Sequence, residues 1–263
     1  DVCSSDLLIS KQERETIMRK ITLTILASIF LVASTVTASY AGSFGIGIQG
    51  AITTIKASGS ETGTVNGSDV ETNRAADVSN DVVIPGIYAE YTTDLDYVGS
   101  LTLGLEMVPG SADVSNSVLT RTDTETSVSG TAAAVSNQRE FKAQAEVENY
   151  NTIYAEIPFP LFDLSDNGAY VRLGFSQIDL NTTETASGNG GSYGNTSVDG
   201  INYGIGFKNN MTDNFVMKVS YEATDFDSIN LTSTGNSADS GTNSISANLD
   251  TWAIKVAIDR KSV

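Results

Sequence analysis

The sequence contains no histidine, and this absence restricts its chemistry more than any other feature. Histidine is the commonest general base, the commonest metal ligand and the usual partner of a nucleophilic serine. Without it, the common hydrolase and metal sites lack their central residue. The composition therefore argues against an enzyme.

Cysteine and basic residues are also scarce. The single cysteine, Cys3, lies close to the first residue, so the rest of the chain can form no disulfide and has no thiol chemistry. Lysine and arginine total 15 against 32 aspartates and glutamates, which gives a net charge of −17. Such a negative field repels nucleic acid, and no basic patch with interleaved aromatics is present. We exclude nucleic acid as a partner.

The two ends of the chain do not read as parts of a folded domain. Residues 1–17 and 259–263 are interpreted as artefacts, because their outermost stretches back-translate into nucleotide sequences that resemble sequencing adapters. The remainder of 1–17 reads as untranslated leader before a start at Met18. We expect the natural C-terminus to lie beyond Ile258.

Residues 18–41 read as a secretory signal peptide. Arg19 and Lys20 form a basic start, and an apolar stretch follows. The segment ends at Ser39-Tyr40-Ala41, with small residues at the two positions that signal peptidase reads, so we predict cleavage after Ala41. The alternative is a transmembrane anchor, but the apolar run is short for one and ends in a cleavage-type tripeptide.

Beyond this segment, apolar and polar residues alternate with a period of two, which is typical of strands with two different faces. The pattern predicts about eight strands of roughly ten residues, the length that a tilted strand needs to cross a bilayer. The alternating runs cover 44–48, 87–91, 101–107, 153–157, 169–175, 201–207, 215–221 and 252–258.

The connections between these runs alternate in length. Short links are predicted at 92–96, 160–167 and 209–214, and long polar loops at 58–81, 110–148, 181–200 and 225–248. Outer-membrane barrels have this pattern, with short turns in the periplasm and long loops outside.

The two faces of the predicted strands differ in charge. One face is apolar, and the other carries residues that could form a balanced network: Glu90, Glu106, Glu156, Arg172, Lys208, Lys218, Glu222 and Lys255. An arginine or lysine facing lipid would cost roughly 2–4 kcal/mol, whereas charges inside a narrow barrel can pair with one another. We predict an all-β, antiparallel up-and-down transmembrane β-barrel over residues 42–258. The alternative is a secreted β-sandwich with one solvent-exposed polar face.

One hairpin carries a family resemblance. Tyr203-Gly204-Ile205-Gly206-Phe207-Lys208, then Thr212-Asp213-Asn214, then a strand from Phe215 to Glu222, resembles a hairpin of OmpA-like small barrels of the opacity and OmpX type. The resemblance implies an eight-stranded barrel in the outer membrane of a Gram-negative bacterium, with a structural or adhesive role and no catalytic residues. The terminal aromatic residue of such barrels is absent, which truncation after Ile258 explains.

Three features of the sequence resemble motifs of binding or catalytic sites. Gly45–Gly50 fits a dinucleotide-binding pattern, but alternation continues where a helix should begin, so we interpret these glycines as packing on a crowded inner face. Asp163–Gly168 departs from calcium-loop spacing at Ser165, which favours a turn. The four glutamates share their face with cations, which favours a structural network over a glycosidase pair. We predict no catalytic, cofactor or metal site.

The sequence thus predicts a structural or surface-interaction barrel of the outer membrane, with long polar extracellular loops that serve adhesion or envelope integrity. The alternative is a narrow porin-like channel for small solutes or ions. The predicted partners are outer-membrane lipid, the barrel assembly machinery and a surface ligand contacted by the loops. A membrane-embedded hydrolase or acyltransferase is disfavoured because histidine is missing.

Overall fold

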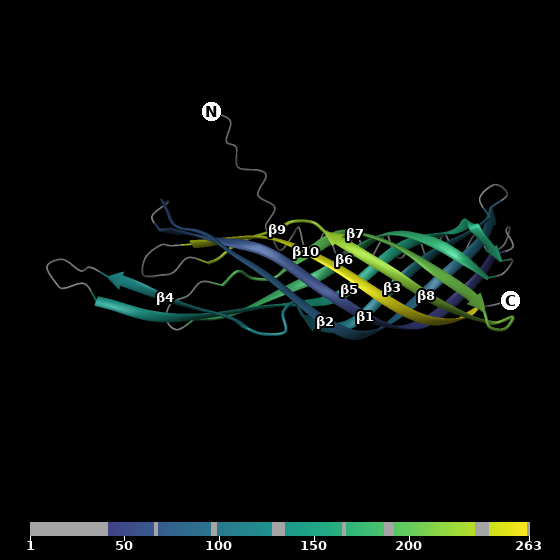
Figure 1. The fold of residues 1–263 in the computed structure, drawn as a ribbon, viewed down its shortest axis with the longest axis horizontal. Coiled ribbons are helices and arrows are strands. Elements are labelled where there is room, and N and C mark those ends of the chain that lie inside the picture. Colours follow the sequence, from purple (N-terminus) through teal and green to yellow (C-terminus); the bar gives the residue numbers. More distant parts are fainter. Residues whose placement is uncertain are drawn as a thin grey trace, which may run out of the picture. The chain divides into compact units, whose positions relative to one another are not determined.

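The regular elements in the described part of the chain are β-strands (Figure 1). The computed structural model describes residues 42–65, 68–95, 99–127, 135–164, 167–186, 192–234 and 242–261. The strands in these ranges are β1 (Gly42–Val65), β2 (Ser68–Leu95), β3 (Gly99–Asp113), β4 (Leu119–Ser127), β5 (Val135–Leu164), β6 (Asn167–Ala186), β7 (Thr196–Asn210), β8 (Phe215–Phe226), β9 (Ile229–Thr232) and β10 (Thr242–Lys261). Within these ranges, no helix is long and apolar enough to cross a membrane. The predicted leader and signal peptide, with the cleavage site after Ala41, lie outside the described residues.

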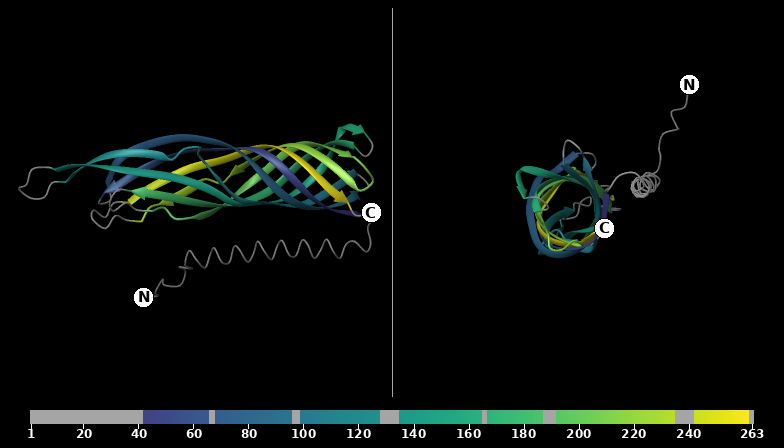
Figure 2. Two further views of the ribbon diagram at one scale, coloured as in Figure 1. Left: turned by 90° about the horizontal axis from the view of Figure 1, so that it is seen from below. Right: turned by 90° about the vertical axis from the view of Figure 1, so that its right-hand side faces the viewer.

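The strands of the unit Ser43–Val263 close into a ring, which Figure 2 shows end-on. Its order is β1, β2, β3, β5, β6, β7, β8, β10, and β10 pairs with β1 to complete it. The two remaining strands lie beside the ring, β4 paired with β5 and β9 paired with β10. Each predicted run falls, in order, within one ring strand. This confirms the up-and-down β-barrel.

The strands are much longer than predicted, and this corrects the extent of the loops. β1, β2 and β5 have 24, 28 and 30 residues, where roughly ten had been expected. The polar segment 58–81, predicted as a loop, is strand except at residues 66–67, which are not described. Ladder hydrogen bonds join backbone groups whatever the side chains are. Segments rich in Ser, Thr and Asn therefore extend the wall without any apolar alternation that would reveal it.

Burial alternates along the strands, with the polar side chains inside. In β8 every second residue from Val216 to Phe226 is buried, and this set includes Lys218 and Glu222. The residues between them point outward and are mostly apolar. Large apolar side chains are accordingly among the most exposed in the barrel, with Ile48 at 68% and Phe175 at 70%. This is the reverse of a soluble protein, and it places the apolar face outside as the sequence predicted.

Charged residues bound the apolar exterior. On β10 the outward residues between Asp250 and Arg260 are apolar and exposed: Trp252, Ile254, Val256 and Ile258. Asp250 pairs with Asp225 of β8 and with Lys56 of β1, so three charged residues lie at one height. Ten residues of a strand tilted by about 40° rise about 26 Å, close to the apolar band of membrane barrels, about 25 Å tall. The exterior is the lipid-facing belt of a membrane-spanning barrel.

Candidate functional site

Charged side chains gather inside the barrel, at the height of the middle of the belt. The structure brings together seven of the eight residues proposed for an interior network: Glu90, Glu106, Glu156, Arg172, Lys218, Glu222 and Lys255. None of them is more than 6% exposed. The eighth, Lys208 of β7, is half-buried and forms no ion pair with the side chains that the structure describes. We call the seven residues the charged layer.

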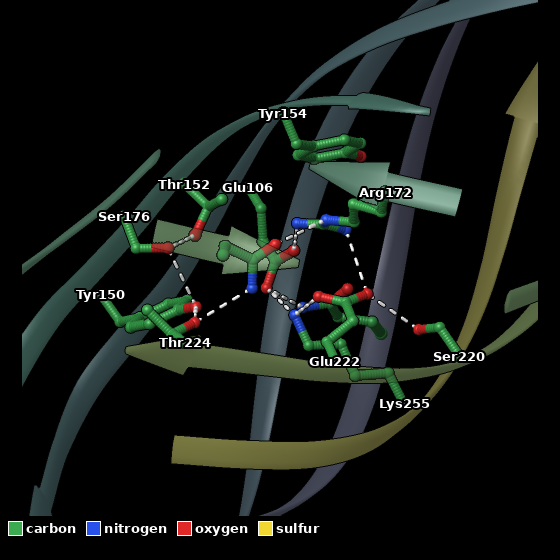
Figure 3. A network of polar contacts seen from close by, with 12 residues as sticks. Glu106, Tyr150, Thr152, Tyr154, Arg172, Ser176, Ser220, Glu222, Thr224 and Lys255 are labelled. Carbon is green, nitrogen blue, oxygen red and sulfur yellow. Dashed lines mark hydrogen bonds and ion pairs between the residues drawn. The ribbon is translucent and has the colours of Figure 1, made fainter. Parts of the chain in front are cut away.

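Two cations and two glutamates form a closed cycle of ion pairs in this layer (Figure 3). Arg172 of β6 places Nη2 2.5 Å from Oε2 of Glu106 and Nη1 3.2 Å from Oε1 of Glu222. Lys255 of β10 places Nζ 2.5 Å from Oε1 of Glu106 and 2.8 Å from Oε2 of Glu222. Glu106 lies on β3 and Glu222 on β8, so three of the four pairs join strands that are not neighbours in the ring, and the fourth, Lys255–Glu222, joins the adjacent strands β10 and β8. The cycle therefore spans the lumen.

Lys218 of β8 contacts the two remaining glutamates of the layer. Its Nζ pairs with Glu90 of β2 and lies 2.8 Å from Oε2 of Glu156 on β5. Nη1 of Arg172 lies 3.9 Å from Oε1 of Glu156, which connects the two halves. Four carboxylates and three cations then leave a formal charge of −1 (−4 + 3) when all are ionised. The near balance is what allows so many charges to be buried together.

Aromatic rings support the cations, and glycines make room for the rings. The guanidinium of Arg172 stacks 3.5 Å from the ring centroid of Tyr154, within the range of a cation–π interaction. The hydroxyl of Tyr154 donates to Oε1 of Glu90 at 2.6 Å. Gly104 lies opposite Tyr154 in the β3–β5 ladder, and a Cβ there would overlap the ring. The glycine is therefore required by this close approach.

The glycine motif near the start of β1 divides between the two faces. Gly47 faces inward, where a Cβ would overlap the ring of Tyr88, as expected for a crowded interior. Gly50 faces outward, and nothing lies within 4 Å of the position a Cβ would take. The inner-face interpretation is correct for Gly47 and wrong for Gly50.

Uncharged residues that the sequence analysis did not single out complete the layer. Nε2 of Gln49 donates to Oε1 of Glu106 at 2.7 Å, and Oγ of Ser220 donates to Oε1 of Glu222 at 2.8 Å. Nε of Arg172 donates to Oδ1 of Asn202 at 3.1 Å. Gln49, Ser220 and Asn202 stand at inward-facing alternate positions of their strands, and this alternation could have identified them. The predicted network included charged residues only.

Asp259 is a further buried carboxylate, at 1% exposure. It lies on the inward face of β10, opposite Gly47 of β1 and Val216 of β8. β10 continues past Ile258, the last residue of the predicted barrel, to Lys261. The alternation of inward and outward residues along β10 would have predicted that Asp259 faces the lumen.

An apolar layer fills the lumen on the side of the charged layer away from the β7–β8 turn. It consists of buried residues from most of the ring: Ile55, Val114, Val147, Ile178, Leu180, Val198, Phe226, Ile229, Leu231 and Leu249. A cavity of about 60 Å³ lies between the two layers, with Glu106 and Lys255 on one side and Ile55 and Val147 on the other. The lumen is thus filled by two layers of opposite chemistry.

The chemistry available to the charged layer is structural. Its carboxylates are held by cations from other strands, so the network joins distant parts of the wall. In the described part of the chain, no group of three or more acidic or sulfur-bearing side chains is placed to hold a metal ion.

Comparisons with known proteins concern the fold alone. No protein-family model and no curated protein sequence matches the chain. Among solved structures, it is similar to the outer membrane protein OprG of Pseudomonas aeruginosa, at 13% identity and a TM-score of 0.45, over 85% of this chain and 97% of that one. It is also similar to Ail, the attachment invasion locus protein of Yersinia pestis, at 14% identity and a TM-score of 0.33, over 83% of this chain and 98% of that one. In fold, the chain is similar to small outer-membrane β-barrels.

Proposed function

We propose that this chain is an integral protein of the outer membrane of a Gram-negative bacterium, and that it acts as a structural or surface-interaction barrel and not as a channel. The observation that carries the proposal is the charged layer, which joins strands across the lumen. A barrel of eight strands is just wide enough to be filled by its own side chains. An open pore would require several buried ion pairs to separate, and each separation leaves an uncompensated buried charge.

The exterior supports lipid as a permanent partner. The apolar belt has the height of a membrane core, and a closed ring leaves no unpaired strand edge in the hydrocarbon. Insertion of such a barrel would involve the barrel assembly machinery. The short connections, such as 211–214 between β7 and β8, would then lie in the periplasm, and the extended ends of β1, β2 and β5 would project outside. These projecting ends are the surface that we propose for external interactions.

The proposal includes no catalytic role, since the chain has no histidine and the four carboxylates of the charged layer are paired with cations.

Planar-bilayer recording tests whether the barrel is closed. We expect the folded full chain to give no conductance steps above those of a protein-free bilayer, because side chains fill its lumen. Boiled protein serves as the control for contaminants and for non-specific leakage. Reproducible discrete steps seen only with folded protein would reject the proposal in favour of a narrow channel for ions or small solutes.

A further inference from the structure

A second, larger cavity lies in the projecting part of the barrel. Its volume is about 510 Å³, and its surface is predominantly apolar. The wall includes inward side chains from several strands: Ala57, Val78, Val114, Ala145, Ile245 and Ala247. Ligand pockets typically have volumes of about 300–1,000 Å³ and mostly apolar linings. The cavity therefore has the size and chemistry of a small-molecule site.

The cavity is separated from the interior of the membrane-spanning part. It shares no lining residue with the small cavity above the charged layer. On β1, Ile55 lines the small cavity and Ala57 lines the larger one. On β5, Val147 lines the small cavity and Ala145 lines the larger one. Ile55 and Val147 belong to the apolar layer, against which Ala57 and Ala145 pack. The apolar layer is thus the floor of a blind pocket.

A polar bridge crosses the lumen beside this pocket. Tyr193, from the segment between β6 and β7, donates its hydroxyl to Oε1 of Glu61 on β1 at 2.5 Å. Its backbone N–H donates to Oε1 of Glu184 on β6 at 3.3 Å. In the ring order, β1 and β6 are four strands apart in either direction. The bridge therefore connects opposite walls of the pocket through one side chain.

We propose that this pocket binds one small, uncharged and predominantly apolar molecule from outside the cell. Open pockets with predominantly apolar linings take up small apolar molecules of matching size. The lining carries two carboxylates, Glu61 and Glu184, against one cation, Lys142, and together with the net charge of −17 this disfavours an anionic ligand. The inference rests on the proposed function, because it supplies a ligand class for the surface that we place outside the membrane.

The test is a binding titration with the neutral dye N-phenyl-1-naphthylamine, whose emission rises in apolar surroundings. The full chain is held in lipid nanodiscs, and empty nanodiscs give the lipid background. We expect one saturable site per chain above this background. Ala145→Trp should weaken binding at least ten-fold, because Ala145 lines the cavity and the indole would occupy it. Ser246→Trp is the matched control, since Ser246 is exposed on the outward face of β10 at the same end.

Each outcome decides the proposal. Ile245→Trp, which fills the pocket from the β10 wall, replaces Ala145→Trp if that variant does not fold. Absence of saturable binding above empty nanodiscs would overturn the inference, and so would equal losses in the filling and control variants. Conductance in bilayers would reject only the proposed closed barrel. A silent bilayer without dye binding would reject only the pocket.

Discussion

At the scale of single residues, Arg172 matters most to the charged layer. It contacts Glu106 and Glu222 with two nitrogens, Asn202 with the third, and Tyr154 with its flat face. Few side chains can do this, because only arginine combines a permanent charge with a planar fork of donors. Loss of Arg172 would leave Glu106 and Glu222 with Lys255 as their shared cation among these pairs.

We predict that Arg172→Met lowers the free energy of unfolding by roughly 3–5 kcal/mol, the cost of removing one partner from a buried ion pair. Urea unfolding in lipid vesicles measures the effect, with fluorescence of the single tryptophan, Trp252, as the reporter on the lipid-facing surface. Lys208→Met is the control, since Lys208 makes no ion pair among the described side chains, and its effect should stay below about 1 kcal/mol. Similar losses in both variants would contradict the importance of the network.

At the scale of elements, a long strand of the ring such as β10 lies in two environments along its length. β10 is lipid-facing from Trp252 to Ile258, and beyond Asp250 its outward residues Ser244, Ser246 and Asn248 are polar. The backbone ladder with β1 continues through both parts. The strand is therefore one hydrogen-bonded element, although only part of it contacts the membrane.

This division predicts a large and a small loss of stability for the same substitution at two positions of one strand. Val256→Arg, near the middle of the belt, should lower folding stability in vesicles by roughly 2–4 kcal/mol, because the guanidinium would face lipid. Ser246→Arg, beyond the charged edge of the belt, should change it by less than about 0.5 kcal/mol. Equal effects at the two positions would mean that the belt has been placed wrongly.

At the scale of the whole molecule, closure of the ring is the decisive property. The pairing of β1 with β10 runs from Gly45–Lys261 to Thr64–Thr242, so the first and last strands adjoin along most of their length. A closed ring leaves no strand edge to begin unfolding or to pair with another chain. The two layers in the lumen add contacts between strands that the ladder alone does not join.

Closure predicts that the folded protein resists sodium dodecyl sulfate at room temperature and migrates differently from boiled protein in a denaturing gel. Ala257→Pro should abolish the difference, because Ala257 lies within the β1–β10 and β10–β8 ladders and proline removes a ladder donor. Asn248→Pro lies beyond the belt and should retain at least part of the shift. Identical migration of boiled and unboiled wild-type protein would count against a closed ring.

Alternation along the chain predicted the strands and their two faces, and the charges on one face predicted which of the two lies inside. Successive side chains of a strand point to opposite sides, so parity tells which residues share a face, and the cost of a cation facing lipid places the charged face in the lumen. Glu106, Arg172 and Lys255 could be placed inside for this reason. Strand ends could not be predicted, because polar residues such as those of 58–81 pair through their backbones and leave no periodic signal.

Which residues meet across the lumen was decided only by the tertiary structure. The sequence placed Lys208 and Lys218 on the same face, and the two lie opposite each other in the β7–β8 ladder, yet of the two only Lys218 pairs with Glu90 and Glu156 among the described side chains. The positions of the apolar layer and of the pocket beside it were likewise decided only by the tertiary structure. Ile55, Ile178 and Leu249 come from distant segments, and only ring closure and strand tilt bring them to one height.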